Sequence, residues 1–200
     1  MPRPKIHDEA LRVRLLEQAV RTLSEQGPDG LRLRKLAAEV GTSTTAVYSL
    51  FGGKAGLLAA LFDEACTRFG RRMAEVKLTG DLRADIFALG MAYREGALNE
   101  PHFYQVMFGL VDAVMAECPS SRQQAEGTVR PLVDVVRRAI EAGQLPKAEP
   151  STIAASVWAC VHGLVSLELR SLLPPTAGEP AHVYRQALRS MGEGWRLGSI

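Results

Sequence analysis

The chain has 200 residues, a mass of 21.7 kDa, and hydrophobic (46%) and charged (23%) fractions close to those of average globular proteins. This length is enough to bury a sizeable core, so disulfide-stapled mini-proteins are excluded, and the composition argues against wholesale disorder and against coiled-coil filaments. The formal net charge is only +2, which on its own gives no reason to expect a nucleic-acid binder.

Apolar residues recur at spacings of three and four along most of the chain, and we find no sustained alternation of period two. Short segments that contain Gly, Pro or Ser separate these stretches. The sequence therefore predicts an all-α protein with about nine helices.

Most of the positive charge lies near the N-terminus. The first 60 residues carry nine Lys and Arg against six Asp and Glu, whereas the remainder carries 15 against 16. Arg3 and Lys5, which alternate with prolines, form either a basic arm that reaches DNA or an ordinary frayed terminus. Acidic residues follow them instead of an apolar stretch, so the start is no signal peptide and we expect a cytoplasmic protein.

The next elements are one long helix and two short ones. The first is expected over about 8–25 and is stopped by Gly27 and Pro28. A short helix then ends at Gly41, and Ser43 is a plausible N-cap for a second short helix with Val47 and Phe51 turned inward. Two short helices joined by a Gly-containing turn form the helix-turn-helix arrangement that places one helix in the DNA major groove.

That geometry leaves hydroxyl-bearing side chains on the outward face of the second short helix. Thr can contact base edges and the thymine methyl, while Tyr suits a phosphate oxygen. Cations lie before the turn and at the start of the next helix, where free backbone N–H groups also favour an anion. The candidate DNA-binding residues are Arg3, Lys5, Arg34, Lys35, Ser43, Thr44, Thr45, Tyr48 and Lys54. On spacing alone, an ordinary helical hairpin with solvated charges remains an alternative.

Residues 33–58, LRKLAAEVGTSTTAVYSLFGGKAGLL, closely resemble the DNA-binding module of the TetR (tetracycline repressor) family of bacterial regulators. The residues that match in register are Arg34, Leu36, Ala37, Gly41, Ser43, Tyr48, Phe51, Lys54 and Leu57. Three positions depart from the pattern. Thr42 replaces an apolar residue, Leu50 stands where the family often has His, and Ala55 stands where it often has an acidic residue. Leu50 cannot donate to a phosphate, so that contact should be missing or replaced by a van der Waals contact. Direct readout by two Thr is also thinner than a bidentate Arg–guanine pair, so we expect phosphate contacts to supply much of the affinity, with a pronounced salt dependence.

The middle helices, expected at about 54–69, 82–98 and 101–116, are rich in bulky, adaptable side chains. The resemblance implies that this part binds a small molecule, and such side chains suit a mainly apolar effector. The candidate ligand-binding residues are Phe87, Met91, Tyr93, Phe103, Met107, Phe108, Val111, Trp158 and His162. The alternative for each is an ordinary core position. The sequence shows no cluster of carboxylates or cations here, which disfavours a highly charged effector.

Helices are also expected at about 122–142, 151–172 and 181–195. In the second of these, Trp158, His162 and Gly163 resemble the Trp-His-Gly signature of one class of TetR C-terminal domains. His162 is either a structural residue or an effector contact. No second His lies at ligand spacing, and the three cysteines are far apart, so we predict neither a metal site nor a cofactor.

The helix at 151–172 is apolar nearly all round, which one small domain cannot bury alone. Polar residues interrupt it, so we expect a buried helix and not a membrane span. With the last helix it can form a four-helix interface with a second copy of the chain. The candidate interface residues are Ile153, Val157, Val161, Leu164, Leu172, Val183, Ala187, Leu188 and Met191.

The predicted organisation is a helix-turn-helix domain over 1–55 followed by an effector-binding and dimerisation domain over 56–200. The resemblance implies a homodimeric regulator, most often a repressor, that binds a palindromic DNA operator and is released by a small molecule. One alternative is an interaction module that kept the fold and lost DNA binding. Another is a small helical enzyme, which the sequence disfavours because it has no Gly-rich phosphate loop and no nucleophile with an evident base.

Overall fold

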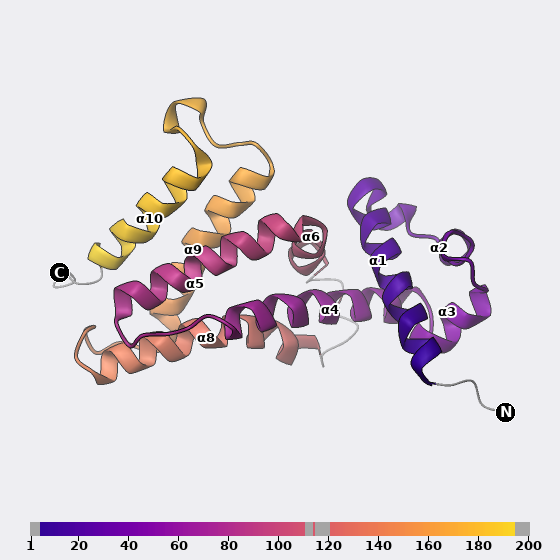
Figure 1. The fold of residues 1–200 in the computed structure, drawn as a ribbon, viewed down its shortest axis with the longest axis horizontal. Helices are drawn as coiled ribbons and strands as arrows, with labels where there is room; N and C mark the ends of the chain where they lie inside the picture. Colours follow the sequence, from indigo (N-terminus) through magenta and orange to yellow (C-terminus); the bar gives the residue numbers. More distant parts are fainter. Residues whose placement is uncertain (1–4, 111–113, 115–120, 195–200) are drawn as a thin grey trace. The chain divides into compact units, whose positions relative to one another are not determined.

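The computed structural model describes residues 5–110, 114 and 121–194 (Figure 1). These described residues form nine α-helices and one 3₁₀ turn with no strand, which confirms the predicted all-α class. The helices are α1 (Lys5–Gly30), α2 (Leu33–Val40), α3 (Thr44–Phe51), α4 (Lys54–Ala74), α5 (Leu82–Asn99), α6 (Pro101–Gly109), α8 (Ser121–Glu141), α9 (Pro150–Leu169) and α10 (Pro180–Gly194), and the 3₁₀ turn is η1 (Pro175–Ala177).

The chain divides into two compact units. One contains the residues up to Thr67 together with His102–Ala125, and the other contains Arg68–Pro101 together with the residues from Glu126 onward. Helix α4 belongs to both, because the division falls between Thr67 and Arg68.

In the first unit, α1 packs on both α2 and α3, and α2 packs on α3. One stripe of α1 is buried, with Leu16, Ala19, Val20 and Leu23 all in the core. The helical run over Lys5–Gly30 is broken at Gly27, whose φ of 69° is left-handed. The predicted stop at this glycine therefore coincides with a real break in the helix.

The turn between α2 and α3 is built by two local signals. Gly41 adopts φ 74°, its N–H bonds Ala38 O at 3.1 Å, and the next N–H, of Thr42, bonds Ala37 O at 2.8 Å. This is the Schellman end of a helix, which needs a residue tolerant of the left-handed conformation. The Ser43 hydroxyl then accepts the Ala46 N–H at 3.1 Å, which caps α3 as predicted.

The second unit is organised around α5, which packs on α9 and α10, while α9 also packs on α10 (Figure 1). Tyr184 of α10 is buried, and its hydroxyl donates to the carbonyl oxygen of Gly90 on α5 at 2.7 Å. Arg94 of α5 binds the carboxylate of Glu168 on α9 through two nitrogens, at 2.8 and 2.5 Å. Such a fork-to-fork pair fixes the relative position of two helices as well as neutralising two poorly exposed charges.

A buried carboxylate organises the loop that leads into α5. Asp85 accepts hydrogen bonds from the Thr79 N–H at 2.6 Å, the Thr79 hydroxyl at 2.9 Å and the Gly80 N–H at 3.0 Å. Gln144, which follows α8, accepts the Leu82 N–H at 3.2 Å and donates to the Gly80 carbonyl at 3.4 Å. The loop before α5 is thus held from both sides.

The predicted helix bounds differ from the structure mainly at their ends. Helix α1 begins at Lys5, α9 ends at Leu169 instead of 172, and α6 ends at Gly109 where the sequence predicted 116. Residues 111–113, 115 and 116 of that predicted segment lie outside the described residues.

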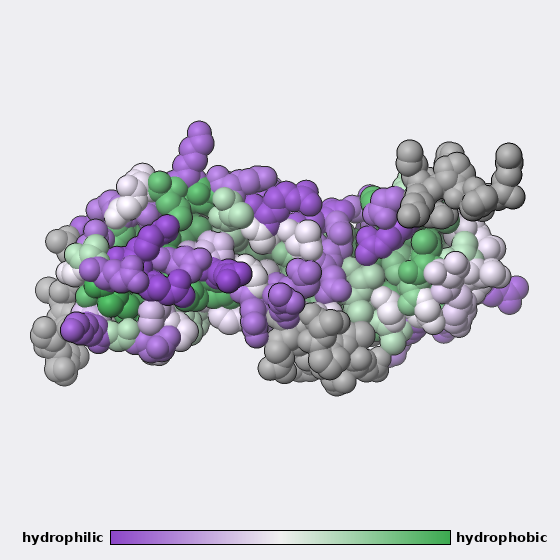
Figure 2. Space-filling view, turned by 90° about the horizontal axis from the view of Figure 1, so that it is seen from below, coloured by the Kyte–Doolittle hydropathy of each residue, from purple (hydrophilic) through white to green (hydrophobic). Residues whose placement is uncertain are grey.

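Helix α9 is also long and apolar enough to cross a membrane, by length and composition alone, a test that core helices of globular proteins pass as well. Polar side chains cover much of the molecular face drawn in Figure 2.

Candidate nucleic-acid interface

Helix α3 presents a polar face to solvent. Val47 and Phe51 are buried, as predicted, whereas Thr45 and Tyr48 are exposed and Thr44 is half-buried. Tyr48 is a large side chain that is 54% exposed. Its ring packs over Gly53, where an added Cβ would lie 3.5 Å from Tyr48 Cε1. Part of the predicted reading face is therefore available to a DNA groove.

Cationic side chains flank this helix. Arg34 and Lys35 on α2 and Lys54 at the first position of α4 are all exposed. The start of a long helix adds free backbone N–H groups beside Lys54, which favours a bound phosphate oxygen. Arg3 lies outside the described residues, and for Lys5 only the helical backbone is described.

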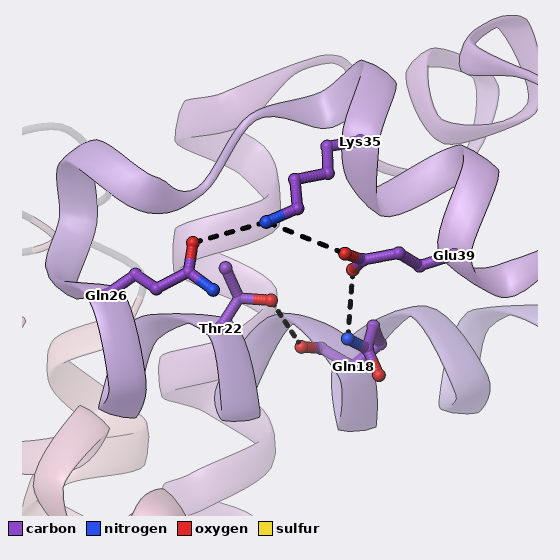
Figure 3. Close-up of polar contacts among 5 residues, drawn as sticks. All are labelled: Gln18, Thr22, Gln26, Lys35 and Glu39. Atoms are coloured by element: carbon purple, nitrogen blue, oxygen red, sulfur yellow. Dashed lines mark hydrogen bonds and ion pairs between the residues drawn. The ribbon is translucent and has the colours of Figure 1, made fainter.

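Lys35 already has partners within the first unit. Its Nζ lies 3.4 Å from Gln26 Oε1 and 3.8 Å from Glu39 Oε1, and Glu39 Oε2 accepts a hydrogen bond from Gln18 Nε2 at 2.9 Å (Figure 3). These contacts tie α2 to α1. A phosphate that contacts Lys35 therefore has to compete with Glu39, whereas among the described residues Arg34 has no such ion pair.

A second contact fixes the end of α2. The guanidinium Nη2 of Arg14 on α1 donates to the carbonyl oxygen of Val40, the last residue of α2. A cation at a helix C-terminus also complements the helix dipole. This side chain was not among the predicted site residues, since its role depends on how α1 packs on α2.

The candidate effector residues fall into both units. Tyr93, Trp158 and His162 come together in the second: the Tyr93 hydroxyl lies 3.2 Å from His162 Nδ1, and the Trp158 and His162 rings are 6.3 Å apart. His162 Nε2 lies 3.4 Å from the hydroxyl of Ser166. Burial and then the charge of Arg170 lower the pKa of His162, so it is a neutral hydrogen-bonding residue near pH 7. Both ring nitrogens have protein partners, which favours the structural role.

The other candidates lie on α5 and α6. Phe87 and Met91 on α5 are half-buried. On α6, Phe103 and Met107 are buried, Phe108 is half-buried, and the rings of Tyr104 and Phe108 lie 4.8 Å apart. Val111 lies outside the described residues.

The candidate dimer residues divide by burial. Ile153, Val157 and Val161 are 1–3% exposed and Leu188 is 2% exposed, so these four belong to the core of the chain itself. These four side chains leave little surface for a second copy to cover, and their role in an interface stays a prediction. Leu164, Val183, Ala187 and Met191 are half-buried, and Leu172 is 61% exposed. The outward side of α9 instead carries Ala155, Ser156, Ala159 and Leu167.

Within the described residues no group of three or more His, Cys, Asp or Glu side chains is placed to hold a metal ion. Cys66 and Cys160 are free thiols. Burial, with the charge of Asp63 as a smaller cause, raises the pKa of Cys66 to about 12.

Two family descriptions match separate parts of the sequence. Residues 15–61 match the description "Bacterial regulatory proteins, tetR family", and residues 86–191 match "Tetracyclin repressor-like, C-terminal domain". The second match alone spans more than half of the chain. The chain belongs to the TetR family. Its fold and family are those of DNA-binding transcription regulators with a helix-turn-helix, as the sequence resemblance implied.

Solved structures share the TetR fold over nearly the whole chain. A protein with unknown function from a Rhodococcus species is 29% identical, with a TM-score of 0.77 and coverage of 93% of this chain and 95% of that one. The TetR-family regulator PfmR from Thermus thermophilus is 16% identical (TM-score 0.70; 94% and 99%). The fatty acid degradation regulator FadR from Bacillus halodurans is 13% identical (TM-score 0.73; 96% and 96%). No curated protein matches the sequence significantly.

Two further positions of this TetR module were not among the residues that the sequence prediction singled out. Ser49 is exposed four residues after Thr45, so it extends the outward face of α3, and helical periodicity alone would have found it. Gly56 on α4 is required for another reason, because a Cβ at this position would lie 1.8 Å from the Phe51 carbonyl oxygen. No local pattern signals that approach.

Proposed function

We propose that this TetR-family protein is a cytoplasmic repressor that binds a palindromic operator as a homodimer and is released by a small, mainly apolar effector. A two-fold dimer would place two α3 helices in successive major grooves, about 34–36 Å apart. Effector binding would favour a state whose two reading helices are wrongly spaced for the operator.

The observation that carries the DNA-binding part is the face of α3. Thr45 and Tyr48 are exposed on a helix that Ser43 caps, and the cations Arg34 and Lys54 lie on the helices before and after it. Side chains that can contact bases thus lie between side chains that can contact phosphates. In protein–DNA complexes, base contacts specify the sequence and phosphate contacts position the protein.

Two further observations support the dimer and the effector. The outward side of α9 is mostly apolar apart from Ser156, with Ala155 and Ala159 exposed and Leu167 40% exposed, and a second copy would cover it. The aromatic and Met side chains of α5 and α6 are the kind that accommodate apolar ligands of varied shape.

The test is a double substitution, Tyr48→Ala with Lys54→Ala, in the full chain. We expect it to abolish retention of an operator duplex from the protein's own promoter region in a gel shift, while light scattering shows an unchanged oligomer. Lys77→Ala is the matched control, since Lys77 is exposed outside the first unit. Unchanged retention by the double variant would refute the proposed interface. Failure of the unaltered protein to bind at low salt would favour an interaction module without DNA binding.

A further inference from the structure

The reading helix has an unusual composition. From Thr44 to Phe51 its sequence is TTAVYSLF, which contains no charged side chain, no His and no amide. Bidentate recognition of guanine requires Arg or Lys, and bidentate recognition of adenine requires Asn or Gln. Helix α3 can make neither of these bidentate contacts. Any base that α3 recognises in the groove has to be recognised by hydroxyl and apolar groups.

The groups that α3 offers to a groove are hydroxyls and apolar groups. The Ser43 hydroxyl is occupied as acceptor of the Ala46 N–H, which directs it to the cap. Thr45 is exposed and lies within the first turn of α3, where recognition helices contact bases. Ala46 and Leu50 of α3 are half-buried, and the Tyr48 ring lies near Gly53, where an added Cβ would be 3.5 Å from Cε1. Among the exposed side chains of α3, which are Thr45, Tyr48 and Ser49, only Thr45 carries a methyl group.

Only one base carries an apolar group in the major groove, namely the C5 methyl of thymine. We infer that this protein recognises its half-site through thymine methyl groups, with the methyl of Thr45 as the main contact, and not through bidentate hydrogen bonds to guanine. The operator is then a duplex with T·A pairs at the positions that face the start of α3.

The helix is held firmly enough to make such a contact selective. Ser43 caps its start, and the N–H of Gly52, in the left-handed conformation, closes its end on the Tyr48 carbonyl at 2.8 Å. On its inner side, Val47 and Phe51 are buried. A methyl contact discriminates only when the side chain cannot move away from an empty position, and this packing provides that constraint.

The inference rests on the proposed DNA-binding function, and the experiment separates the two. The full-length protein selects duplexes from a random-sequence library, and the enriched duplex is resynthesised with deoxyuridine replacing thymine in the half-sites. This change removes the C5 methyl and leaves every hydrogen-bonding group in place. We expect about fourfold weaker binding for each contacted methyl, or about fifteenfold for a symmetric pair.

Three controls sharpen the comparison. One control places deoxyuridine in the spacer between the half-sites. Another replaces guanine by 7-deazaguanine, a base that lacks the N7 acceptor. Each should change the affinity less than twofold. Thr45→Ser removes the methyl and keeps the hydroxyl, so the variant should bind the thymine duplex more weakly than the unaltered protein does. Its affinity for the deoxyuridine duplex should be only slightly lower than its affinity for the thymine duplex. Thr45→Val keeps a methyl and removes the hydroxyl, so it should bind well.

The outcomes are distinguishable. Methyl recognition would be overturned if deoxyuridine did not weaken tight binding, or if 7-deazaguanine lowered the affinity more than deoxyuridine did. Either result would leave the DNA-binding function intact. Full affinity of the Thr45→Ser variant would remove Thr45 from the contact. A library from which no duplex is enriched would instead overturn the proposed function itself.

Discussion

At the scale of single residues, Asp85 shows how one carboxylate organises a loop. It is buried, yet it accepts three hydrogen bonds from Thr79 and Gly80. Burial by itself raises the pKa of Asp85, but these hydrogen bonds, with the charge of Arg138, outweigh it and hold the pKa below its ordinary value. The ionised form therefore stabilises the folded chain.

Replacement of this carboxylate should reveal its contribution and its pH dependence. We expect Asp85→Asn to lower the free energy of unfolding at pH 7 by about 2 kcal/mol, because charge-assisted hydrogen bonds are lost. Since the folded pKa is depressed, the contribution is fully present above the unfolded pKa of about 3.9 and is lost as the pH falls through the folded value. Urea unfolding at pH 7 and pH 3.5 measures both effects. Asp134→Asn, in an exposed pair with Arg137, should cost less than about 0.5 kcal/mol. An equal loss at both pH values would refute the ionic role.

At the scale of elements, the connection between α3 and α4 depends on glycines with different roles. The chain bends by 61° between the two helices. Gly52 closes α3 with a φ of 73°, and Gly56 allows the first turn of α4 to approach the carbonyl oxygen of Phe51. This junction fixes Lys54, at the start of α4, relative to the reading face of α3. It also joins the reading helix to the helix that continues into the second unit.

A methyl group at the junction should therefore disturb both stability and DNA binding. In Gly56→Ala the new Cβ would lie 1.8 Å from the Phe51 carbonyl oxygen, so α3 and α4 have to separate. We expect a loss of about 2 kcal/mol of unfolding free energy and weaker operator binding. Gly70→Ala on the same helix is the control, because its Cβ meets nothing within 4 Å and Ala favours a helix over Gly by about 1 kcal/mol. Thermal melts and gel shifts of both variants measure the contrast, and a Gly56→Ala protein as stable as Gly70→Ala would contradict it.

The helices and turns also show which structural features can be predicted from the sequence and which cannot. The turn between α2 and α3 was predictable because its signals, Gly41 and Ser43, act on their own neighbours. Gly56 was not, since its close contact arises from a bend in three dimensions. Helix α9 is apolar on nearly every side, so periodicity could not tell its inner face from its outer one. The predicted dimer residues therefore include both Ile153, which lies in the core, and Leu172, which is 61% exposed.

At the scale of the whole molecule, the net charge of +2 conceals an uneven distribution. The first 60 residues carry an excess of three positive charges, and these include Arg34 and Lys54 beside the reading helix. One such module offers few phosphate contacts. Two modules on a two-fold axis double them, so a dimer explains how a weakly basic chain could hold DNA.

The outward face of α9 is where we expect this dimer to form. Ala155 and Ala159 are exposed, and a Cβ at Gly163 would meet nothing within 4 Å, so the backbone of a second helix can approach closely. Ala159→Arg places a long charged side chain in that contact, and we expect light scattering to show a monomer whose affinity for a palindromic duplex falls to that of a single half-site. Ala74→Arg, an exposed position at the end of α4, should leave both the dimer and the affinity unchanged. If the Ala159→Arg protein stays dimeric and binds the duplex as before, the two copies meet through another surface.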